Sequence, residues 1–282
     1  MIEKLFYLLE KLSENRTILS FIIRKIFRDS NFLSIEKTIK LNASSRPAYL
    51  YCAYRAAQLA KKLGHKKISF IEFGVAEGNG LNFLEKISAR IEKELDVEIE
   101  LYGFDTGEGL FEPQDYKDLG YFFKSSMYKM NKEKLNKNLI KSKLILGDVK
   151  DTVKNFFERY NPPPIAAIFN DLDFYSSTIN SFEIFKGDNK HFLPRIFCYF
   201  DDIVGSEYEM YNEFSGELLA INEFNKANDN KKICLNRNLL SLNSHSWRHQ
   251  IYYFHNFNHQ DYNKYIGEEE QKKIKSSIQL KN

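Results

Sequence analysis

Residues 68–80 read Ile-Ser-Phe-Ile-Glu-Phe-Gly-Val-Ala-Glu-Gly-Asn-Gly, and this stretch decides the fold. The apolar run at its start predicts a buried strand over Lys67–Phe73. The glycines let the backbone turn sharply after that strand, and helical spacing of apolar residues follows over Leu81–Leu95. A strand, turn and helix of this kind are typical of sheets that are covered by helices.

The same alternation of strands and helices continues along the chain. Apolar runs bounded by polar or turn-forming residues predict further strands over Val97–Phe104, Lys143–Leu146, Ile165–Asn170, Arg195–Phe200, Lys232–Asn236 and Gln250–Phe257. Helices are expected between them, including Thr152–Tyr160. Because strands that alternate with helices favour parallel pairing with right-handed crossovers, the predicted fold class is α/β. We expect a doubly wound, mostly parallel seven-stranded sheet.

This α/β domain is expected to span residues 44–266. Residues 1–43 are predicted to form an N-terminal helical extension, in which Ile2–Leu12 has the spacing of an amphipathic helix. Residues 267–282 are polar and are predicted to form a disordered tail.

Charge and composition limit the kinds of partner that the chain is expected to bind. The formal net charge is only +3, which is too balanced to predict nucleic acid or an anionic membrane as a partner. The apolar run Ile18–Ile23 is far too short to span a bilayer, so no membrane span is expected. The three cysteines are widely spaced, so a disulfide framework is not expected and a cytoplasmic location is the simplest interpretation.

Acidic residues stand where the predicted strands end. Asp105 and Asp148 end the second and third predicted strands. Asp171-Leu-Asp173 follows the fourth strand, and Asp201-Asp202 follows the fifth. In open α/β sheets, ligands bind at the carboxyl ends of the strands. We therefore expect these carboxylates and the glycine loop to surround one binding site.

The glycine loop has the pattern Glu72-x-Gly74-x-x-x-Gly78-x-Gly80. This spacing does not match the G-x-G-x-x-G of dinucleotide-binding loops, and Glu77 would repel a phosphate. An acidic loop suits a cofactor with a cationic amino-acid end and no phosphate, which describes S-adenosylmethionine. The alternative is an ordinary strand–turn–helix connection that needs glycine for its turn.

Asp105 and Asp148 extend this interpretation to a nucleoside. The Asp105 carboxylate can accept hydrogen bonds from both ribose hydroxyls, and the Asp148 carboxylate can accept one from the adenine amino group. Taken alone, either residue could equally be the N-cap of a helix. The order of glycine loop, acid and second acid favours the cofactor role.

Asp171, Asp173, Asp201 and Asp202 are expected to converge at adjacent strand ends. Converging carboxylates repel one another and therefore demand a cation. A set of ligands that are all oxygen suits Mg²⁺, Mn²⁺ or Ca²⁺. Such a metal can lower the pKa of a substrate hydroxyl, so that its oxygen attacks a methyl sulfonium. The alternative is that these residues cap helices and form solvated turns.

Three stretches resemble class I S-adenosylmethionine-dependent methyltransferases: 73–78, 102–110 and 146–152. The specific resemblance is to metal-dependent sugar O-methyltransferases of the macrocin and mycinamicin type. Those enzymes have a glycine loop, a Phe-Asp-Ser-Phe-Glu-Gly-Leu-like stretch, an Asp-x-Asp-x-Tyr-x-Ser-Thr stretch and an Asp-Asp pair in that order. Here the last two are Asp171–Thr178 and Asp201-Asp202, so the resemblance covers residues 65–205.

The resemblance implies a set of site residues. Asp171, Asp201 and Asp202 would bind the metal, and Asp171 would share the catalytic role with Asp173, a candidate base or extra ligand. The cofactor would be bound by the glycine loop and the next two strand ends, through Glu72, Gly74, Val75, Ala76, Glu77, Gly78, Asp105, Thr106, Asp148 and Val149.

The implied reaction is O-methylation, assisted by a divalent metal, of a hydroxyl on a sugar or a glycosylated metabolite. Gly107 stands where the family has an aromatic residue, and the insertion Glu112–Asn138 does not match the macrolide enzymes. We expect the aromatic stretch Phe111–Met130 to form a lid or an acceptor wall. The N-terminal helices are expected to cover the site or to make the contact of a homo-oligomer.

Two other functions stay open from the residues alone. Asp171-Leu-Asp173 could be the DxD motif of a nucleotide-sugar glycosyltransferase, although a diphosphate would want basic partners near that motif. The chain could also be a non-catalytic binding protein of the same fold. Stabilisation by UDP-sugars but not by S-adenosylhomocysteine would favour the glycosyltransferase.

Overall fold

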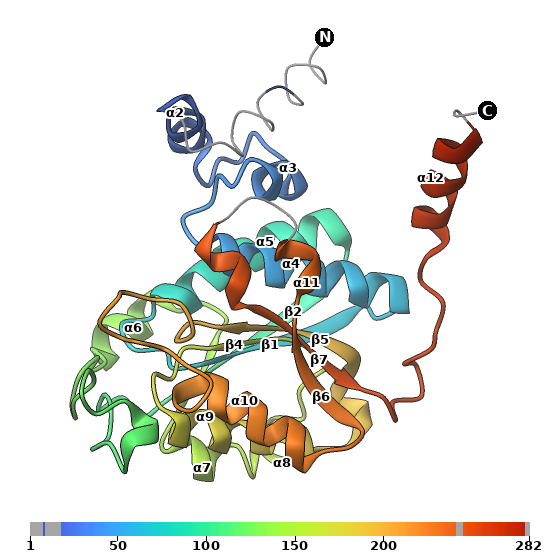
Figure 1. Ribbon diagram of the computed structural model, residues 1–282. Helices are drawn as coiled ribbons and strands as arrows, with labels where there is room; N and C mark the ends of the chain where they lie inside the picture. The colour runs from blue at the N-terminus through green and yellow to red at the C-terminus, as the bar shows by residue number, and fades with distance from the viewer. Residues whose placement is uncertain (1–7, 9–17, 241–244, 280–282) are drawn as a thin grey trace.

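The computed structural model describes residues 8, 18–240 and 245–279. Its centre is a seven-stranded sheet of order β3-β2-β1-β4-β5-β7-β6 (Figure 1). The strands are β1 (Lys67–Phe73), β2 (Glu98–Asp105), β3 (Lys143–Leu146), β4 (Ile165–Asn170), β5 (Phe192–Phe200), β6 (Lys231–Leu235) and β7 (Ile251–Asn256). Pairing is parallel from β3 to β5, and β7 is antiparallel to both β5 and β6. The predicted α/β fold with a mostly parallel sheet is confirmed.

Helices cover both faces of the sheet (Figure 1). One face packs against α4 (Pro47–Leu63), α5 (Asn79–Leu95), α11 (Arg237–Leu240) and η4 (Ser246–Gln250). The other face packs against α7 (Val149–Thr152), α8 (Phe156–Tyr160), α9 (Tyr175–Ser181), η2 (Phe182–Lys186) and α10 (Gly216–Ala227). Burial of apolar side chains on both faces is what holds a parallel sheet of this kind together.

Helix α4 places an aromatic side chain beside the strand ends. It starts with a proline in its first turn and ends at Gly64, whose φ of 91° lies in the left-handed region. Tyr49 in its first turn is buried, and its ring stacks on Phe169 of β4 with 4.6 Å between ring centroids. The start of α4 is thereby held against the part of the sheet where the predicted site lies.

The N-terminal helices α2 (Ile18–Phe27) and α3 (Ile35–Lys40) precede the sheet, as expected. The amphipathic helix predicted over Ile2–Leu12 lies outside the described residues, apart from Leu8. Within the described ranges, no helix is both long enough and apolar enough to cross a membrane.

The C-terminal segment differs from the disordered tail that we expected, because it contains α12 (Glu268–Gln279). Three glutamates in its first turn suit the positive end of the helix dipole. Glu268 pairs with Lys272 at 2.9 Å, and Glu270 pairs with Lys62 of α4 at 2.6 Å. Ile274 and Ile278 stand four residues apart, so helical spacing and charge interactions were both signals that the sequence prediction overlooked.

Other elements connect the strands, and one prediction among them was inaccurate. They are η1 (Tyr116–Asp118), α6 (Lys132–Asn138) and η3 (Asn189–His191). The single helix predicted over Thr152–Tyr160 is instead the pair α7 and α8. The Asp148 side chain accepts a hydrogen bond from the Lys150 amide at 2.8 Å, so α7 begins three residues before the predicted start.

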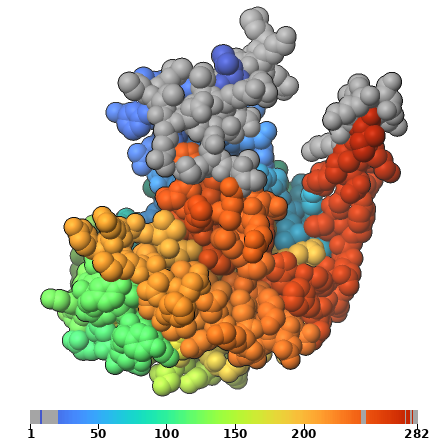
Figure 2. All heavy atoms as spheres, in the orientation of Figure 1, coloured from blue at the N-terminus to red at the C-terminus, as the bar shows by residue number. Residues whose placement is uncertain are grey.

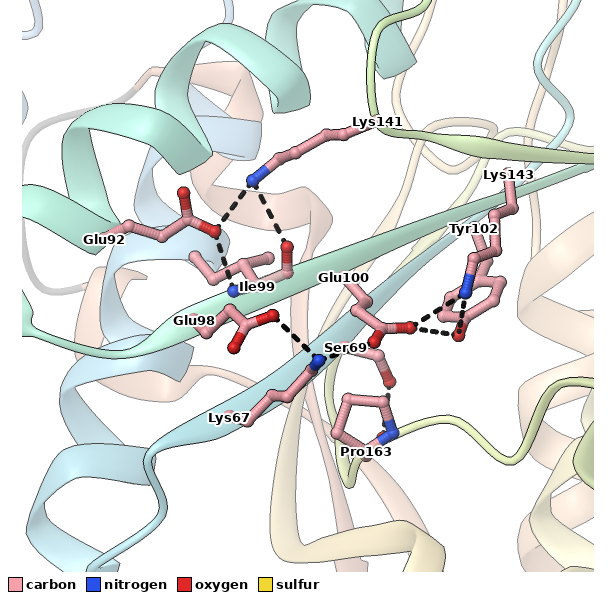
Figure 3. A network of polar contacts seen from close by, with 10 residues as sticks. All are labelled: Lys67, Ser69, Glu92, Glu98, Ile99, Glu100, Tyr102, Lys141, Lys143 and Pro163. Atoms are coloured by element: carbon pink, nitrogen blue, oxygen red, sulfur yellow. Dashed lines mark hydrogen bonds and ion pairs between the residues drawn. The ribbon is translucent and has the colours of Figure 1, made fainter.

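Charged residues at the amino-terminal edge of the sheet are paired with one another (Figure 3). The Lys67 ammonium lies 2.8 Å from carboxylate oxygens of both Glu98 and Glu100. The Lys143 ammonium lies 3.1 Å from Glu100, and it also lies 4.9 Å from the centroid of the Tyr102 ring. Each carboxylate of this edge network therefore has a positive partner within the protein.

Candidate functional site

A cavity of about 530 Å³ opens at the carboxyl ends of β1, β2, β4 and β5. Residues 109–128, after β2, and 204–211, after β5, supply two of its walls. The Tyr121 hydroxyl joins these segments by donating a hydrogen bond to the Glu209 carbonyl at 2.6 Å. Figure 2 shows the green and orange surfaces of these two segments side by side.

The structure brings most of the predicted site residues to this cavity. Its lining includes Glu72, Gly74, Val75, Ala76, Glu77, Asp105, Thr106, Val149, Asp171, Asp173, Asp201 and Asp202. Two of the predicted residues, Gly78 and Asp148, are not part of the described lining. Gly78 instead has a φ of 80° and forms the N-cap of α5, which is a position that glycine suits.

Gly74 lies where the glycine loop passes closest to β4. Its φ is 84°, and a Cβ atom at this position would lie 1.7 Å from the backbone oxygen of Asp171. Any larger residue would collide with the backbone at the end of β4. The absence of a side chain therefore allows the loop and the Asp171 region to share one cavity.

Glu72 is a buried carboxylate with an unused oxygen. The Tyr49 hydroxyl donates a hydrogen bond to Oε1 at 2.8 Å, whereas Oε2 has no partner among the described residues. Burial raises the pKa of Glu72 to about 8, against smaller lowering effects from Tyr49 and Arg46. Arg46 lines the same cavity, and its guanidinium carbon lies 5.0 Å from the Tyr49 ring centroid. This end of the cavity thus offers one acceptor and one cation.

Asp105 holds the glycine loop in place. Its Oδ2 accepts hydrogen bonds from the Val75 and Ala76 amides at 2.9 Å each, and its Oδ1 accepts one from the Gly107 amide at 2.5 Å. Oδ2 uses both of its lone pairs in these bonds, whereas Oδ1 has a second lone pair that can accept one further donor from the cavity. Thr106, which follows, donates its hydroxyl proton to the Gly109 carbonyl at 3.1 Å.

Asp148 is the N-cap of α7, which is the alternative to a cofactor contact that the sequence left open for this residue. Its neighbours Gly147 and Val149 line the cavity, and its own side chain accepts from the Lys150 amide. The structure therefore favours contact between a ligand and the residues on either side of Asp148, because these line the cavity and Asp148 is not part of the described lining.

Three carboxylates meet at the ends of β4 and β5. Asp171, Asp201 and Asp202 each offer an oxygen atom, and these atoms lie within 4.8 Å of one another. Burial and the neighbouring carboxylates raise the pKa of Asp171 well above its usual range, and burial and Asp201 raise that of Asp202 to about 7. Burial and crowding both disfavour the charged form of a carboxylate that has no cation beside it.

Neutral donors hold the aspartate pair of β5 in position. Asp201 accepts hydrogen bonds at Oδ1 from the Tyr199 hydroxyl and, at 3.2 Å, from the Gln250 side-chain amide. Asp202 accepts at Oδ1 from the Tyr211 hydroxyl at 2.8 Å and at Oδ2 from the Asp173 amide at 2.9 Å. These bonds orient the carboxylates as outer partners orient metal ligands, and they add no positive charge.

Glu217 of α10 contacts the backbone of the turn that contains Asp202. Its Oε2 accepts a hydrogen bond from the Asp202 amide at 2.9 Å, and its Oε1 is buried without a partner among the described residues. Burial and the nearby Asp202 raise the pKa of Glu217 well above its usual range. The backbone position of Asp202 is thereby tied to α10.

Asp173 lies beside the three carboxylates and keeps its own carboxylate free. Its side chain is 8% exposed, its φ is 58°, and the described residues offer its oxygens no hydrogen-bond donor. Burial, then Asp202 and Asp201, raise its pKa to about 9. A non-glycine residue with positive φ is strained, and such strain is common where a side chain must face a ligand.

Sequence reasoning missed several cavity residues. Arg46 was interpreted only as part of the start signal of a helix. That helix, α4, starts beside the carboxyl ends of the strands, so Arg46 lines the cavity. Tyr211 and Gln250 carry no motif, so only the three-dimensional arrangement reveals their contacts with Asp202 and Asp201. The aromatic insertion does form a wall, through Phe111, Phe123 and Tyr128.

Known structures share this architecture. The calicheamicin methyltransferase CalS11 superposes with a TM-score of 0.52 at 17% identity, covering 90% of this chain and 91% of that chain. The O-methyltransferase NovP superposes with a TM-score of 0.51 at 14% identity, covering 74% of this chain and 79% of that chain. No family model and no curated protein sequence matches the chain. The similarity is one of fold, and the chain has the Rossmann-like fold of methyltransferases.

Proposed function

We propose that this protein is an S-adenosylmethionine-dependent methyltransferase that methylates a hydroxyl on a sugar or a glycosylated metabolite with the help of a divalent metal. The observation that carries the proposal is the sharing of one cavity by the glycine loop and three carboxylates that have no lysine or arginine partner in the described part of the chain. The methyltransferase fold shared with the calicheamicin methyltransferase CalS11 and the O-methyltransferase NovP supports it.

The cofactor end of the cavity fits a zwitterionic amino acid. The unused, buried Oε2 of Glu72 is an acceptor for an ammonium group, and Arg46 is a partner for a carboxylate. Asp105 and Thr106 would face the ribose, and the backbone around Gly147 and Val149 the adenine. Arg46 is the single basic residue in the described lining, so a cofactor with phosphates lacks the partners it needs.

The donor set of Asp171, Asp201 and Asp202 fits a hard divalent cation, most simply Mg²⁺, with Mn²⁺ or Ca²⁺ as substitutes. When bound, S-adenosylmethionine supplies a methyl group on a sulfonium, and the metal lowers the pKa of the acceptor hydroxyl. Asp173, whose carboxylate has no hydrogen-bond donor among the described residues, would accept the proton of that hydroxyl. Tyr211 and Gln250 keep Asp202 and Asp201 oriented.

Calorimetric titration with S-adenosylhomocysteine, in the presence and absence of Mg²⁺, tests this function. We expect binding of the cofactor product by the wild-type chain. Asp201→Asn should retain that binding and lose turnover. A chain that binds no S-adenosylhomocysteine is not a methyltransferase.

The glycosyltransferase alternative finds less support in the site. A diphosphate bound at Asp171-Leu-Asp173 would want basic residues, and the described lining near that motif holds acidic and aromatic ones instead. Stabilisation of the protein by UDP-glucose and not by S-adenosylhomocysteine would reverse the ranking. A protein that binds neither cofactor nor divalent metal would point to a non-catalytic binding role.

A further inference from the structure

The cavity is more acidic than a methyl donor and a metal require. Its described lining holds one basic side chain, Arg46, and eight acidic ones: Glu72, Glu77, Asp105, Asp171, Asp173, Asp201, Asp202 and Glu209. A divalent ion and the sulfonium cofactor do not offset all of these carboxylates. The uncompensated charge is part of the surface that meets the acceptor.

Two carboxylates of this surface have free oxygens at the acceptor end. Asp173 is buried, lines the cavity and has no hydrogen-bond donor among the described residues. Glu209 accepts at Oε2 from the Ser206 amide, and its Oε1 has no donor within the described part of the chain. Glu209 is positioned over the cavity by its own segment, which the Tyr121 hydroxyl ties to the insertion.

Aromatic rings complete the acceptor end. Phe111 and Tyr128 line the cavity with 48% and 50% of their surface exposed, so their rings are available for contact. Ring faces attract cations, and they also pack against the apolar faces of small rings. No lysine, arginine or histidine of the described lining lies at this end, since Arg46 belongs to the glycine-loop end.

Resting on the proposed methyltransferase function, we propose that the acceptor carries a protonated amine near its reacting hydroxyl, as an amino sugar does. Glu209 pairs with the ammonium group, and the Tyr128 ring packs beside it. Charge-assisted hydrogen bonds to a carboxylate are strong, whereas a sugar nucleotide would bring phosphates into a surface of like charge. The class of substrate is thus a cationic glycoside.

The test compares glycosides that differ in charge. Kanamycin, its fully N-acetylated derivative and UDP-glucose are titrated calorimetrically into the protein with saturating S-adenosylhomocysteine and Mg²⁺. Kanamycin carries amines at several ring positions, so the position of the recognised amine need not be known. We expect kanamycin to bind at least about tenfold more tightly than the acetylated form, and UDP-glucose to bind more weakly still.

Two variants separate specific recognition from general attraction. Glu209→Gln keeps an oxygen for the Ser206 amide, so the segment can fold as before, and it should remove most of the preference for the amine. Glu207→Gln removes the same charge from the same segment at an exposed residue outside the described lining, and it should leave the preference unchanged.

Each other result overturns the inference. Equal affinity for the amine and its acetylated form, tighter binding of UDP-glucose, or no binding of kanamycin would each do so. An equal loss in both variants would reduce the effect to bulk charge and also overturn it. Absence of S-adenosylhomocysteine binding in the same titrations marks the separate failure of the proposed function, on which this inference depends.

Discussion

The amino-terminal and carboxyl-terminal edges of the sheet differ in whether their carboxylates have positive partners. At the amino-terminal edge, the carboxylates of Glu98 and Glu100 lie 2.8 Å from the Lys67 ammonium (Figure 3). At the carboxyl-terminal edge, three aspartates gather their oxygens within 4.8 Å, and the described residues give them no lysine or arginine partner. One edge balances its charge internally, and the other leaves its carboxylates without a lysine or arginine partner among the described residues.

The same contrast appears in proton affinity. At the amino-terminal edge, partial burial raises the pKa of Glu100, but hydrogen bonds from Lys67, Tyr102 and Lys143 lower it overall to about 2. At the carboxyl-terminal edge, burial and Asp201 raise the pKa of Asp202 to about 7. Carboxylates in one sheet therefore differ by function: those with internal partners stabilise the fold, and those without partners are available to a ligand.

The largest expected effect comes from Asp201→Asn. Removing one ligand from the triad should weaken Mn²⁺ binding by at least about 100-fold, since even outer-shell changes cost 10–100-fold. Affinity for S-adenosylhomocysteine should stay within about twofold, because Asp201 is not among the residues expected to bind the cofactor. Calorimetry measures both. Glu100→Gln is the matched control at the opposite edge, and an equal loss of metal affinity there would contradict the comparison.

Next in size is the pH dependence of the metal-free protein. Asp202, Glu72 and Asp173 have folded-state pKa values of about 7, 8 and 9, above the values near 4 of unfolded carboxylates. Their contribution to stability is complete below about pH 4 and is lost as the pH rises through the folded-state values. Each group contributes a slope of at most about 1.4 kcal/mol per pH unit.

Thermal melts in EDTA from pH 5 to 9 check this slope. The melting temperature should fall as the pH rises, and saturating Mn²⁺ should reduce the fall because a bound cation replaces the protons. A melting temperature that rises with pH across this window in EDTA would contradict the assignment of the uncompensated charge to the carboxyl-terminal edge.

A smaller effect is expected from Arg46→Met, which removes the single cation of the described lining. Loss of a charge-assisted hydrogen bond should weaken S-adenosylhomocysteine binding by about tenfold. 5′-Methylthioadenosine lacks the amino-acid end and serves as the internal control, so its affinity should not change. A parallel loss for both ligands would mean that Arg46 supports the structure and not the carboxylate of the cofactor.

The smallest effect belongs to Lys67→Met at the amino-terminal edge. The Lys67 side chain is 41% exposed, and ion pairs of exposed groups contribute about 0–1 kcal/mol. Urea denaturation should therefore give a free energy of unfolding within about 1 kcal/mol of the wild-type value, with Mn²⁺ affinity unchanged. A loss of Mn²⁺ affinity would show that the two edges are coupled.

The fold was predictable because burial on both faces leaves a strong pattern of apolar strands. The strand over Ile165–Asn170 was predicted at its observed limits, whereas β5 begins at Phe192 and not at Arg195. A proline at 194 weakened the strand signal there, although β5 continues through it. Hydrophobicity therefore predicted which segments form strands, whereas the exact ends of the strands depend on pairing with neighbouring strands.

The site was predictable in part for a different reason. The chemistry of Asp171, Asp201 and Asp202 follows from their place after parallel strands. Asp148 could not be assigned, because capping a helix and accepting from a ligand use the same carboxylate. Glu209 comes from a loop whose path depends on the insertion, so no periodicity pointed to it.

Gly74 has a consequence for anyone who wishes to redesign this protein. Its missing side chain lets the cofactor loop pass against the backbone of Asp171, where a Cβ would lie 1.7 Å from the oxygen. The loop after β1 and the segment after β4 are therefore packed against each other, so the proposed methyl-donor and metal sites could not be exchanged separately. Variation is better directed to the walls 109–128 and 204–210, which can be changed to alter the acceptor while Tyr211 continues to hold Asp202.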